Sequence, residues 1–441
     1  MFNRDEKRSK ARSTKPLKDL VAVEPIEQLL DDKKRQALLL QISESIGLDS
    51  SNFNKLALPL VHNVTRYCQN LPEASLYYAH RGGLIDRTLN RTEAALQLVR
   101  RLLVLGKDDK PSEEQKLWLY ALFSAGMLRG IGALHTDYSV ELFDANGQQV
   151  KRWQPLLEDL SSVGKYFHYD FLRADETSFR NDVSLLLARQ IMPNAGFTWI
   201  MSNPDVFAVW LALLQEDRDT TGPLAAILER ADAIAIQRDI TDYLVKNAEF
   251  GEGRGNRIGT FVDVAPENSV ERDRVLGAEF IAWLTKSLES GKIVINKVPL
   301  HIQVLANGVI MDPQVLDIYI QEHRKVKNRV AIQNAFLASN LHRLTDAAKK
   351  SLQLGKQDSK LATAGIPLDP AILPEKFKIY NAKSGKITTM TSLDLIYNMQ
   401  NHSQANPVEL GSTLSHLSST GKWVSREENS IEQRYENTQR V

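Results

Sequence analysis

Between residues 25 and 248, apolar residues recur at the three- and four-residue spacing of amphipathic helices. The clearest stripes run over residues 56–67, 88–105, 113–128, 181–191, 205–214 and 223–239. Further helix is expected between Pro25, which suits a first turn, and Gly47, which suits a helix end. Because alternation with a period of two is scarce here, the pattern predicts a mainly α first domain over residues 25–248.

Two short stretches within that domain alternate like strands. They cover residues 139–143 and 149–153 and flank Asn146-Gly147, a pair that favours a type I′ hairpin turn. We therefore expect a small β-insert on the helical body.

Helical periodicity is lost at a glycine-rich stretch, and we place a linker over residues 249–270. Four glycines, Gly251, Gly253, Gly255 and Gly259, alternate there with charged residues. Their spacing does not match a nucleotide-binding loop, and no strong strand precedes them, so the stretch predicts a domain boundary.

The pattern after the linker predicts a helix, a hairpin and a second helix. A helix with an apolar face ends at Gly291, strand-like segments flank Asn307-Gly308, and Pro313 opens a further helix. This plan predicts a winged-helix (α+β) domain over residues 271–325. A basic amphipathic helix is expected over 326–360 and an irregular extension over 361–441, with small elements near 377–380, 386–390 and 393–399.

The charge is nearly balanced overall but unevenly distributed. The 441 residues include 55 Lys+Arg and 54 Asp+Glu, whereas residues 1–18 hold seven basic against two acidic and residues 323–360 hold nine against two. We expect residues 1–24 to be disordered, and both basic segments to suit a polyanion or a solvated surface. The predicted phosphate contacts of the winged-helix domain, which a solvated or protein-docking face would equally explain, are Lys286, Lys292, Lys297, Arg324 and Lys325.

Cysteine content and hydropathy indicate a reducing compartment. Cys68 is the only cysteine, so no disulfide framework can form. The sequence also predicts no membrane span and no signal peptide, and we expect a cytoplasmic protein.

Residues 71–89, which read LPEASLYYAHRGGLIDRTL, are the most informative stretch of the chain. Together with FIAWL at 280–284 and NGVIM at 307–311, they resemble the TraI-type relaxases of the MobH class, DNA-processing proteins of conjugative and integrative elements. The resemblance covers residues 25–239 and then the second domain. It implies an HD-like all-α domain followed by a winged-helix domain.

The resemblance also implies a metal site, and this sequence departs from it. HD-type sites hold divalent metals with imidazoles and carboxylates. Tyr77 and Tyr78 fall on the family's histidine cluster, which leaves only His80 in the loop, and Arg87 falls on the histidine that follows the two glycines. Arg129 and Gly130 replace the His-Asp pair, so that Asp232 alone keeps a carboxylate at a catalytic position.

We therefore expect a catalytically degenerate site without a metal cofactor. One alternative is that His80 regroups with His135, His168 and Asp170 around a divalent metal such as Mn or Mg. Another is a cationic pocket of Arg81, Arg87 and Arg129 that binds phosphate or, as we prefer, pairs internally with Asp86 and Asp232.

The expected function is that of a MobH relaxase-like protein of a mobile element or DNA-transfer system. It would bind DNA, protein components of a transfer complex, or both, as a scaffold. The alternatives are an active metal-dependent phosphodiesterase or DNA-nicking relaxase, and a transcriptional regulator built on the winged helix.

Overall fold

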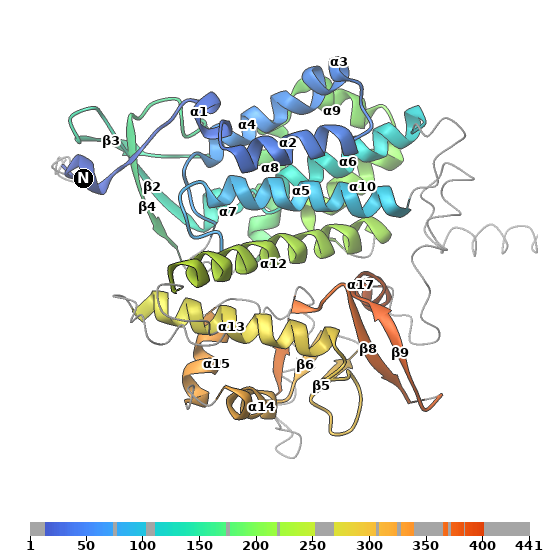
Figure 1. Cartoon of the computed structure of the whole chain (residues 1–441). Coiled ribbons are helices and arrows are strands. Elements are labelled where there is room, and N and C mark those ends of the chain that lie inside the picture. The colour runs from blue at the N-terminus through green and yellow to red at the C-terminus, as the bar shows by residue number, and fades with distance from the viewer. Residues whose placement is uncertain are drawn as a thin grey trace, which may run out of the picture.

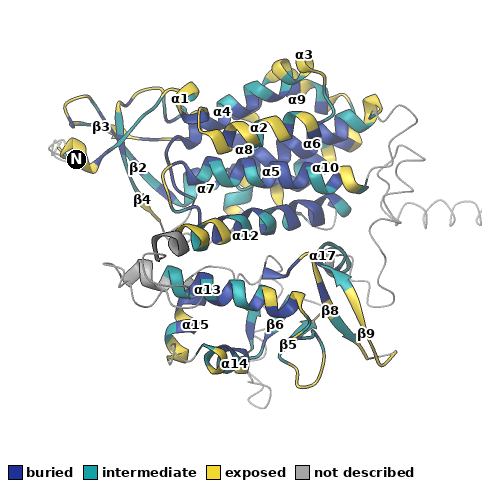
Figure 2. Cartoon of the chain, in the orientation of Figure 1, coloured by how far each residue is buried: buried dark blue, intermediate teal, exposed yellow. Residues whose placement is uncertain are grey.

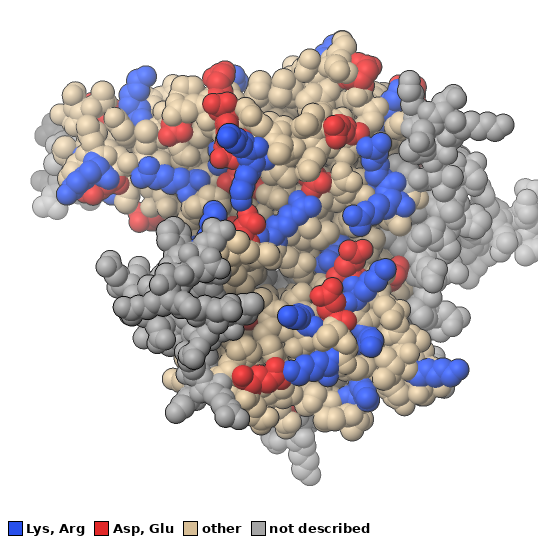
Figure 3. Space-filling model, viewed as in Figure 1, with Lys and Arg blue, Asp and Glu red and all other residues tan. Residues whose placement is uncertain are grey.

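The chain forms a helical body with a projecting sheet, above a smaller mixed unit (Figure 1). This computed structural model describes residues 14–73, 77–102, 111–172, 177–217, 221–251, 269–305, 308–323, 328–338, 365–368, 372–382 and 384–400. The described residues are mainly helical with small sheets, as the sequence predicts. Lys, Arg, Asp and Glu are interspersed over the visible face of the helical body (Figure 3).

The helical body is built around α6, a helix without a polar face. Every residue from Leu117 to Leu128 is buried, and Figure 2 shows the surrounding helices turning their buried sides towards it. The helices are α1 (Ile26–Leu30), α2 (Lys33–Ser45), α3 (Ser50–Asn52), α4 (Leu58–Cys68), α5 (Gly83–Leu102), α6 (Glu113–Leu128), α7 (Ala133–Thr136), α8 (Thr177–Ile191), α9 (Asn194–Met201), α10 (Pro204–Gln215) and α12 (Pro223–Gly251). A 3-10 turn at Leu17–Asp19 and a π-helical turn at Phe53–Ala57 complete them.

Local sequence fixes several of these helix starts. Ser112 and Gln115 form a capping box at α6, in which each side chain bonds the other residue's backbone N–H. Asn203 caps α10 from the residue before Pro204. Where the structure describes them, the six predicted stripes lie on helices; residues 103–105 of the second stripe are outside the described residues, and the short α9 was not predicted.

One helical stretch, Glu113–Thr136, is long and apolar enough to cross a membrane by length and composition. Of its most apolar window, 83% is buried inside the protein, which is typical of the core helix of a folded domain. α9 and α10 pass the same test only as a pair bent by 118°.

The projecting sheet has four antiparallel strands in the order β1-β4-β2-β3. They are β1 (Val21–Ala22), β2 (Tyr138–Phe143), β3 (Gln149–Arg152) and β4 (Tyr166–Phe171). The predicted hairpin is confirmed, but its turn is not type I′, because Gly147 has φ +74° while Asn146 has a negative φ. Gly147 instead donates to the carbonyl of Asp144 in a turn that begins one residue earlier.

The expectation of disorder over residues 1–24 is wrong from residue 14 onward. Thr14 bridges Gln148 at the hairpin, the Lys15 N–H donates to the Gly147 carbonyl, and β1 pairs with β4. Sheet hydrogen bonds to a distant hairpin therefore order a segment that has no apolar periodicity of its own. Residues 1–13 lie outside the described part of the chain.

In its described residues, the second unit contains a three-stranded antiparallel sheet, a separate hairpin and four helices. Its elements are α13 (Ser269–Glu289), β5 (Ile302–Leu305), β6 (Gly308–Met311), α14 (Gln314–Glu322), α15 (Arg329–Ala338), β7 (Ile366–Leu368), β8 (Lys376–Asn381), β9 (Lys386–Thr391) and α17 (Ser392–Gln400). The predicted helix, hairpin and helix are α13, β5-β6 and α14. Residue 325 does not end the unit, because β7 completes the sheet beside β6.

The irregular extension predicted over 361–441 is also wrong where the structure describes it. β8, β9 and α17 correspond to the small elements expected near residues 377–399, and Phe377, Leu395 and Ile396 are buried. Of the basic helix predicted over 326–360, the structure describes α15. Most of the predicted linker, residues 252–268, lies outside the described residues, and α12 runs to Gly251 before it.

α12 lies between the two units and belongs to both cores. Leu224, Leu228 and Ala231 are part of the first core. Ile236 and Ile240 are part of the second, together with Tyr77 and Tyr78 from the loop before α5. Figure 1 shows α12 along the lower edge of the helical body with α13 beneath it.

Candidate functional site

Three arginine side chains converge on the carboxylate of Asp232. Arg87 Nη2 and Arg91 Nη1 each lie 3.3 Å from Oδ1, and Arg129 Nε lies 3.0 Å from Oδ2. The four side chains are 6 to 17% exposed. We call this set, with Glu73, the arginine cluster.

Helix geometry explains why these residues meet. Arg87 and Arg91 are four residues apart on α5 and therefore share one face of that helix. Arg129 is the C-terminal cap residue of α6, and Asp232 projects from the long α12. Three helices distant in sequence thus contribute to one small polar site between packed apolar faces.

Further contacts occupy most of the guanidinium nitrogens. Arg91 donates from Nε to the Gly126 carbonyl at 2.8 Å and from Nη2 to the Arg129 carbonyl at 3.0 Å. Arg87 forms an ion pair with Glu73, and Arg129 Nη2 lies 3.7 Å from Glu216. Three positive charges face three carboxylates, of which Glu216 is the most exposed.

The arginines hold Asp232 firmly in its ionised form. Burial alone would raise the pKa of this carboxyl, but Arg91, followed by Arg87 and Arg129, lowers it to about 2. Burial also opposes the charge of Arg87, yet Glu73 and then Asp232 raise its pKa. A carboxylate that is ionised and fully engaged by cations does not accept a proton near neutral pH, so Asp232 is not set up as a general base.

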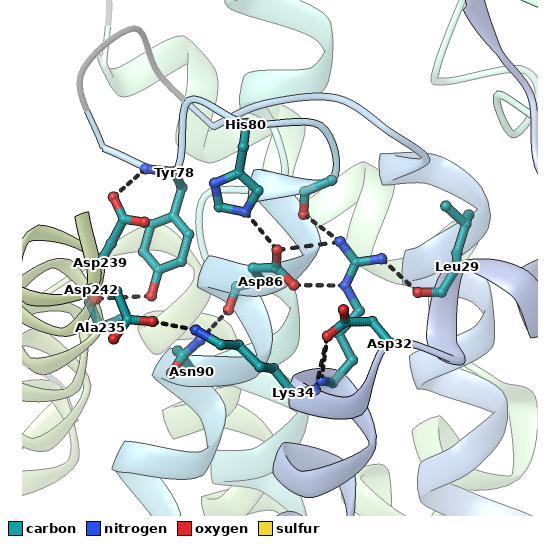
Figure 4. Close-up of polar contacts among 12 residues, drawn as sticks. Leu29, Asp32, Lys34, Tyr78, His80, Asp86, Asn90, Ala235, Asp239 and Asp242 are labelled. Carbon is teal, nitrogen blue, oxygen red and sulfur yellow. Dashed lines mark hydrogen bonds and ion pairs between the residues drawn. The ribbon is translucent and has the colours of Figure 1, made fainter. Parts of the chain in front are cut away.

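Tyr77 and Tyr78 pack against the arginine cluster and α12. The Arg87 guanidinium carbon lies 5.4 Å from the ring centre of Tyr77. Tyr78 donates its N–H to Asp239 at 2.7 Å and its phenol to the Ala235 carbonyl at 2.8 Å (Figure 4). Burial raises the pKa of the Tyr78 phenol, so this side chain stays neutral and anchors the loop to α12.

His80 and Asp86 belong to a neighbouring network with Arg35 (Figure 4). His80 Nε2 lies 2.7 Å from Asp86 Oδ2, and Arg35 Nε donates to Oδ1 at 2.6 Å. Although burial opposes it, these hydrogen bonds lower the pKa of Asp86. The expected pairing of Asp86 with Arg87 or Arg129 is therefore wrong, because Arg35 from α2 takes that carboxylate, and the exposed Arg81 does not join the cluster.

The residues around Asp232 do not fit a divalent metal. Within the described ranges, no three His, Cys, Asp or Glu side chains lie together as a set that could hold one. The expected regrouping also lacks support, since His135 lies edge-on to Phe179, with 6.3 Å between the ring centres, and His168 lies 3.8 Å from Asp170 on β4. A guanidinium is a permanent cation without a lone pair to donate, so three of them oppose a metal ion.

The predicted phosphate-binding lysines of the second unit differ in their surroundings. Lys292 pairs with Glu322 and lies 5.9 Å from the Trp283 ring centre. Lys286 and Lys297 are exposed and have no ion-pair partner among the described residues. Arg324 and Lys325 lie outside those residues.

Some members of the site were missed from sequence. Arg91 lies one helical turn after the predicted Arg87, and this spacing was a usable signal. Glu73 and Glu216 carry no such signal, since each reaches the site through the tertiary fold. Gly130, which follows Arg129, has φ +68° and nothing within 4 Å of the place a Cβ would take.

Comparison with known families identifies the class of this protein. A TraI-type family model, TraI_2, described as "Putative helicase", matches residues 21–252, which is more than half of the chain. The chain therefore belongs to this TraI-type family. A second model, described as "Putative conjugal transfer nickase/helicase TraI C-term", matches residues 275–364. No curated protein matches the chain.

Proposed function

We propose that this chain is a MobH-class, relaxase-like protein of a DNA-transfer system whose HD-type site has become a structural ion cluster. It binds DNA and partner proteins in the cytoplasm as a scaffold and does not cleave DNA. The observation that carries this proposal is the engagement of Asp232 by Arg87, Arg91 and Arg129, because guanidiniums stand where an HD-type site needs metal ligands.

The geometry supports an HD-like fold for residues 25–248. Arg87, Arg129 and Asp232 match family ligand positions that are spread along the sequence, and both arginines pair with the Asp232 carboxylate, while Tyr77 packs against Arg87. In this proposal the scaffold keeps the arrangement of the site while its side chains have changed.

A winged-helix-like role is proposed for the second unit, which we extend from residue 271 to residue 400. The three-stranded sheet and the helices α13, α14 and α15 support it, together with exposed lysines. In this unit the β5–β6 hairpin lies between α13 and α14 in the chain. Its position beside α12 lets it present DNA or a partner protein to the helical body.

The matched families' names mention nickase and helicase, and we propose neither activity for this chain. A nucleotide-driven helicase needs a phosphate-binding loop, and no G-x-x-x-x-G-K-[S/T] motif occurs in the 441 residues. A metal-dependent nickase needs imidazole and carboxylate ligands, which the arginine cluster does not supply.

The test combines metal analysis with a cleavage assay. Purified full-length protein, its Asp232→Ala variant and a matched Asp242→Ala variant are analysed for bound metal and incubated with single-stranded DNA and Mn²⁺. We expect no stoichiometric metal and no cleavage in any of them. Stoichiometric metal with cleavage that disappears only in Asp232→Ala would overturn the proposal and establish an active relaxase.

A further inference from the structure

The β8–β9 hairpin has one apolar face and one basic face. Phe377 is 1% exposed and pairs with Met390, so the alternate positions point to the opposite face of the hairpin. The three cross-strand pairs on that outer face are Lys376 with Thr391, Lys378 with Thr389, and Tyr380 with Ile387. The outer face therefore carries two lysines, hydroxyl groups and Ile387, and a carboxylate that contacts it, that of Asp394, accepts a hydrogen bond from the hydroxyl of Thr391 at 2.5 Å.

The hairpin is held in place by the loop that follows α13. Ile295 donates its N–H to the Lys378 carbonyl at 3.0 Å, and Tyr380 donates to the Ile295 carbonyl at 2.9 Å. Gly291, with φ +76°, leaves room for the Lys378 stem, because a Cβ there would lie 2.5 Å from Lys378 Cδ. Backbone pairing and this close approach thus position Lys378.

The same contacts bring other lysines to this end of the second unit. Lys297 follows the loop that pairs with β8, and Lys286 lies near the end of α13, which packs against β8. Figure 3 shows Lys and Arg side chains over the end of α13 and the hairpin, with Asp and Glu side chains among them. In the part of the chain that the structure describes, Lys286, Lys297, Lys376, Lys378 and Lys386 are exposed and form no ion pair.

Acidic residues near this surface offset little of its charge. Glu322 is engaged by Lys292, and Glu375 lies 3.8 Å from Arg101. Glu289 is exposed near the end of α13. The free lysines therefore outnumber the carboxylates that remain to neutralise them.

We infer that this surface, which we call the lysine ribbon (Lys286, Lys297, Lys376, Lys378 and Tyr380), contacts the phosphate backbone of DNA; Lys386 pairs with Asn381 on the opposite face of the hairpin and is not part of it. Lysines on a flat, exposed ribbon match a polyanion, and the hydroxyls of Tyr380 and Thr389 add uncharged donors of the kind that bind phosphate oxygens. β8 and β9 lie beyond both ranges matched by family models, which end at residues 252 and 364. The inference rests on the proposed DNA-binding function and localises it.

The experiment measures DNA affinity of the full chain against salt concentration by fluorescence anisotropy. Wild type is compared with Lys376→Gln/Lys378→Gln on a duplex and on a single strand of the same sequence. Removing two phosphate contacts should reduce the slope of log K against log salt by about 1.8 for the duplex or about 1.4 for the single strand. A fall in the slope on one substrate and not on the other identifies which form of DNA the ribbon contacts.

Two matched variants control for charge and for folding. Lys33→Gln/Lys55→Gln removes the same charge from exposed, unpaired lysines of the helical body, and it should leave the slope at the wild-type value. Lys376→Arg/Lys378→Arg keeps the charge on the ribbon and should keep the wild-type slope. Circular dichroism of each variant shows that the fold is retained.

The outcomes separate this inference from the proposed function. If wild type binds DNA and the ribbon variant keeps its slope, or loses no more than the Lys33/Lys55 control, the lysine ribbon is not the contact surface and the scaffold function stands. If wild type binds neither duplex nor single strand, DNA binding itself fails, and the ribbon assignment fails with it.

Discussion

At the scale of single residues, the three arginines of the arginine cluster are balanced by three carboxylates once Glu216, beside Arg129, is counted with Asp232 and Glu73. Burying an isolated carboxylate or guanidinium costs several kcal/mol or more, and only close, well-oriented counter-charges offset that cost. Asp232 receives three such partners, while Arg91 adds hydrogen bonds to two backbone carbonyls. The cluster joins α5, α6 and α12 through these buried ion pairs.

Replacing the central carboxylate should therefore be costly. Asp232→Asn keeps the shape of the side chain but leaves three buried guanidiniums facing Glu73 and the more exposed Glu216. We expect the free energy of unfolding, measured by urea denaturation, to fall by about 3 to 5 kcal/mol. Asp242→Asn, which loses only an exposed pair with Lys34, should cost less than about 1 kcal/mol. Equal losses for both variants would contradict a structural role for the cluster.

A second residue-scale prediction concerns Glu279, a carboxyl in the second unit. Burial raises its pKa from 4.5 to about 7, and the phenol of the neighbouring Tyr319 has no hydrogen-bond partner among the described residues. The folded state therefore favours the neutral carboxyl, whereas the unfolded chain ionises it above pH 4.5. The stability that the neutral Glu279 carboxyl contributes to the folded state is fully present below pH 4.5 and is lost as the pH rises through 7.

Glu279→Gln should remove this pH dependence. Thermal unfolding at pH 8 is expected to show the variant more stable than wild type by on the order of 1 to 3 kcal/mol, with the difference vanishing near pH 4. The exposed Glu289→Gln provides the control and should follow the wild-type curve. A Glu279→Gln variant that is less stable than wild type at pH 8 would show that the ionised carboxylate has a favourable partner.

At the scale of elements, Gly83, the first residue of α5, shows how a single glycine permits a close approach of two backbone segments. A Cβ at Gly83 would lie 1.8 Å from the Tyr78 carbonyl oxygen, and that oxygen accepts the Glu73 N–H at 3.0 Å. Glu73 in turn pairs with Arg87. The loop can fold back onto the start of α5 and reach the arginine cluster only if residue 83 has no side chain.

Gly83→Ala should accordingly destabilise the fold beyond the ordinary cost of losing a glycine. The Tyr78 carbonyl must shift, and we expect a loss of about 3 kcal/mol in urea unfolding. Gly385→Ala is the control, because Gly385 also needs a positive φ of +66° but has open space around it. That change should cost about 1 to 2 kcal/mol. A loss no larger in Gly83→Ala would mean that the loop adapts without strain.

The sequence predicted elements well where the signal was local. Long helices such as α5 and α6 have a sustained period, and the β2–β3 hairpin has a turn sequence between alternating strands. α9 was missed because it has eight residues and an apolar surface on several sides. β1 and β7 were missed because two or three residues become strands only through pairing with β4 and β6.

The candidate site was predictable only in part, for a related reason. The family resemblance placed Arg87, Arg129 and Asp232 in one site. In the structure, both arginines donate hydrogen bonds to the Asp232 carboxylate. The choice of partner for Asp86 depended on where α2 packs, which periodicity does not reveal. Positions along elements are thus encoded locally, whereas ion pairing is decided by tertiary packing.

At the scale of the whole molecule, the two units are joined by more than a linker. α12 contributes to both cores, and Arg230 and Gln237 both donate to the Leu373 carbonyl of the second unit, at 2.9 and 3.1 Å. The sequence suggested a boundary after this helix because the glycines follow it. The structure places the junction along the helix itself.

Separating the units at the predicted boundary should therefore expose an apolar surface. A fragment of residues 14–251 would leave Ile236, Ile240, Tyr77 and Tyr78 without the second core, and we expect it to self-associate in sedimentation velocity. The Ile236→Ser/Ile240→Ser version of the fragment should associate less. A monomeric, cooperatively folding wild-type fragment would show instead that the first unit is independent.

The shared helix also constrains how the chain can change in length. Each residue of an α-helix turns its successors by about 100° and advances them by about 1.5 Å. Deleting one residue next to Ala231 would leave Leu224 and Leu228 in place but rotate Ile236 and Ile240 away from the second core. A substitution in α12 changes the contacts of one side chain, whereas an insertion or deletion there would rotate one unit relative to the other.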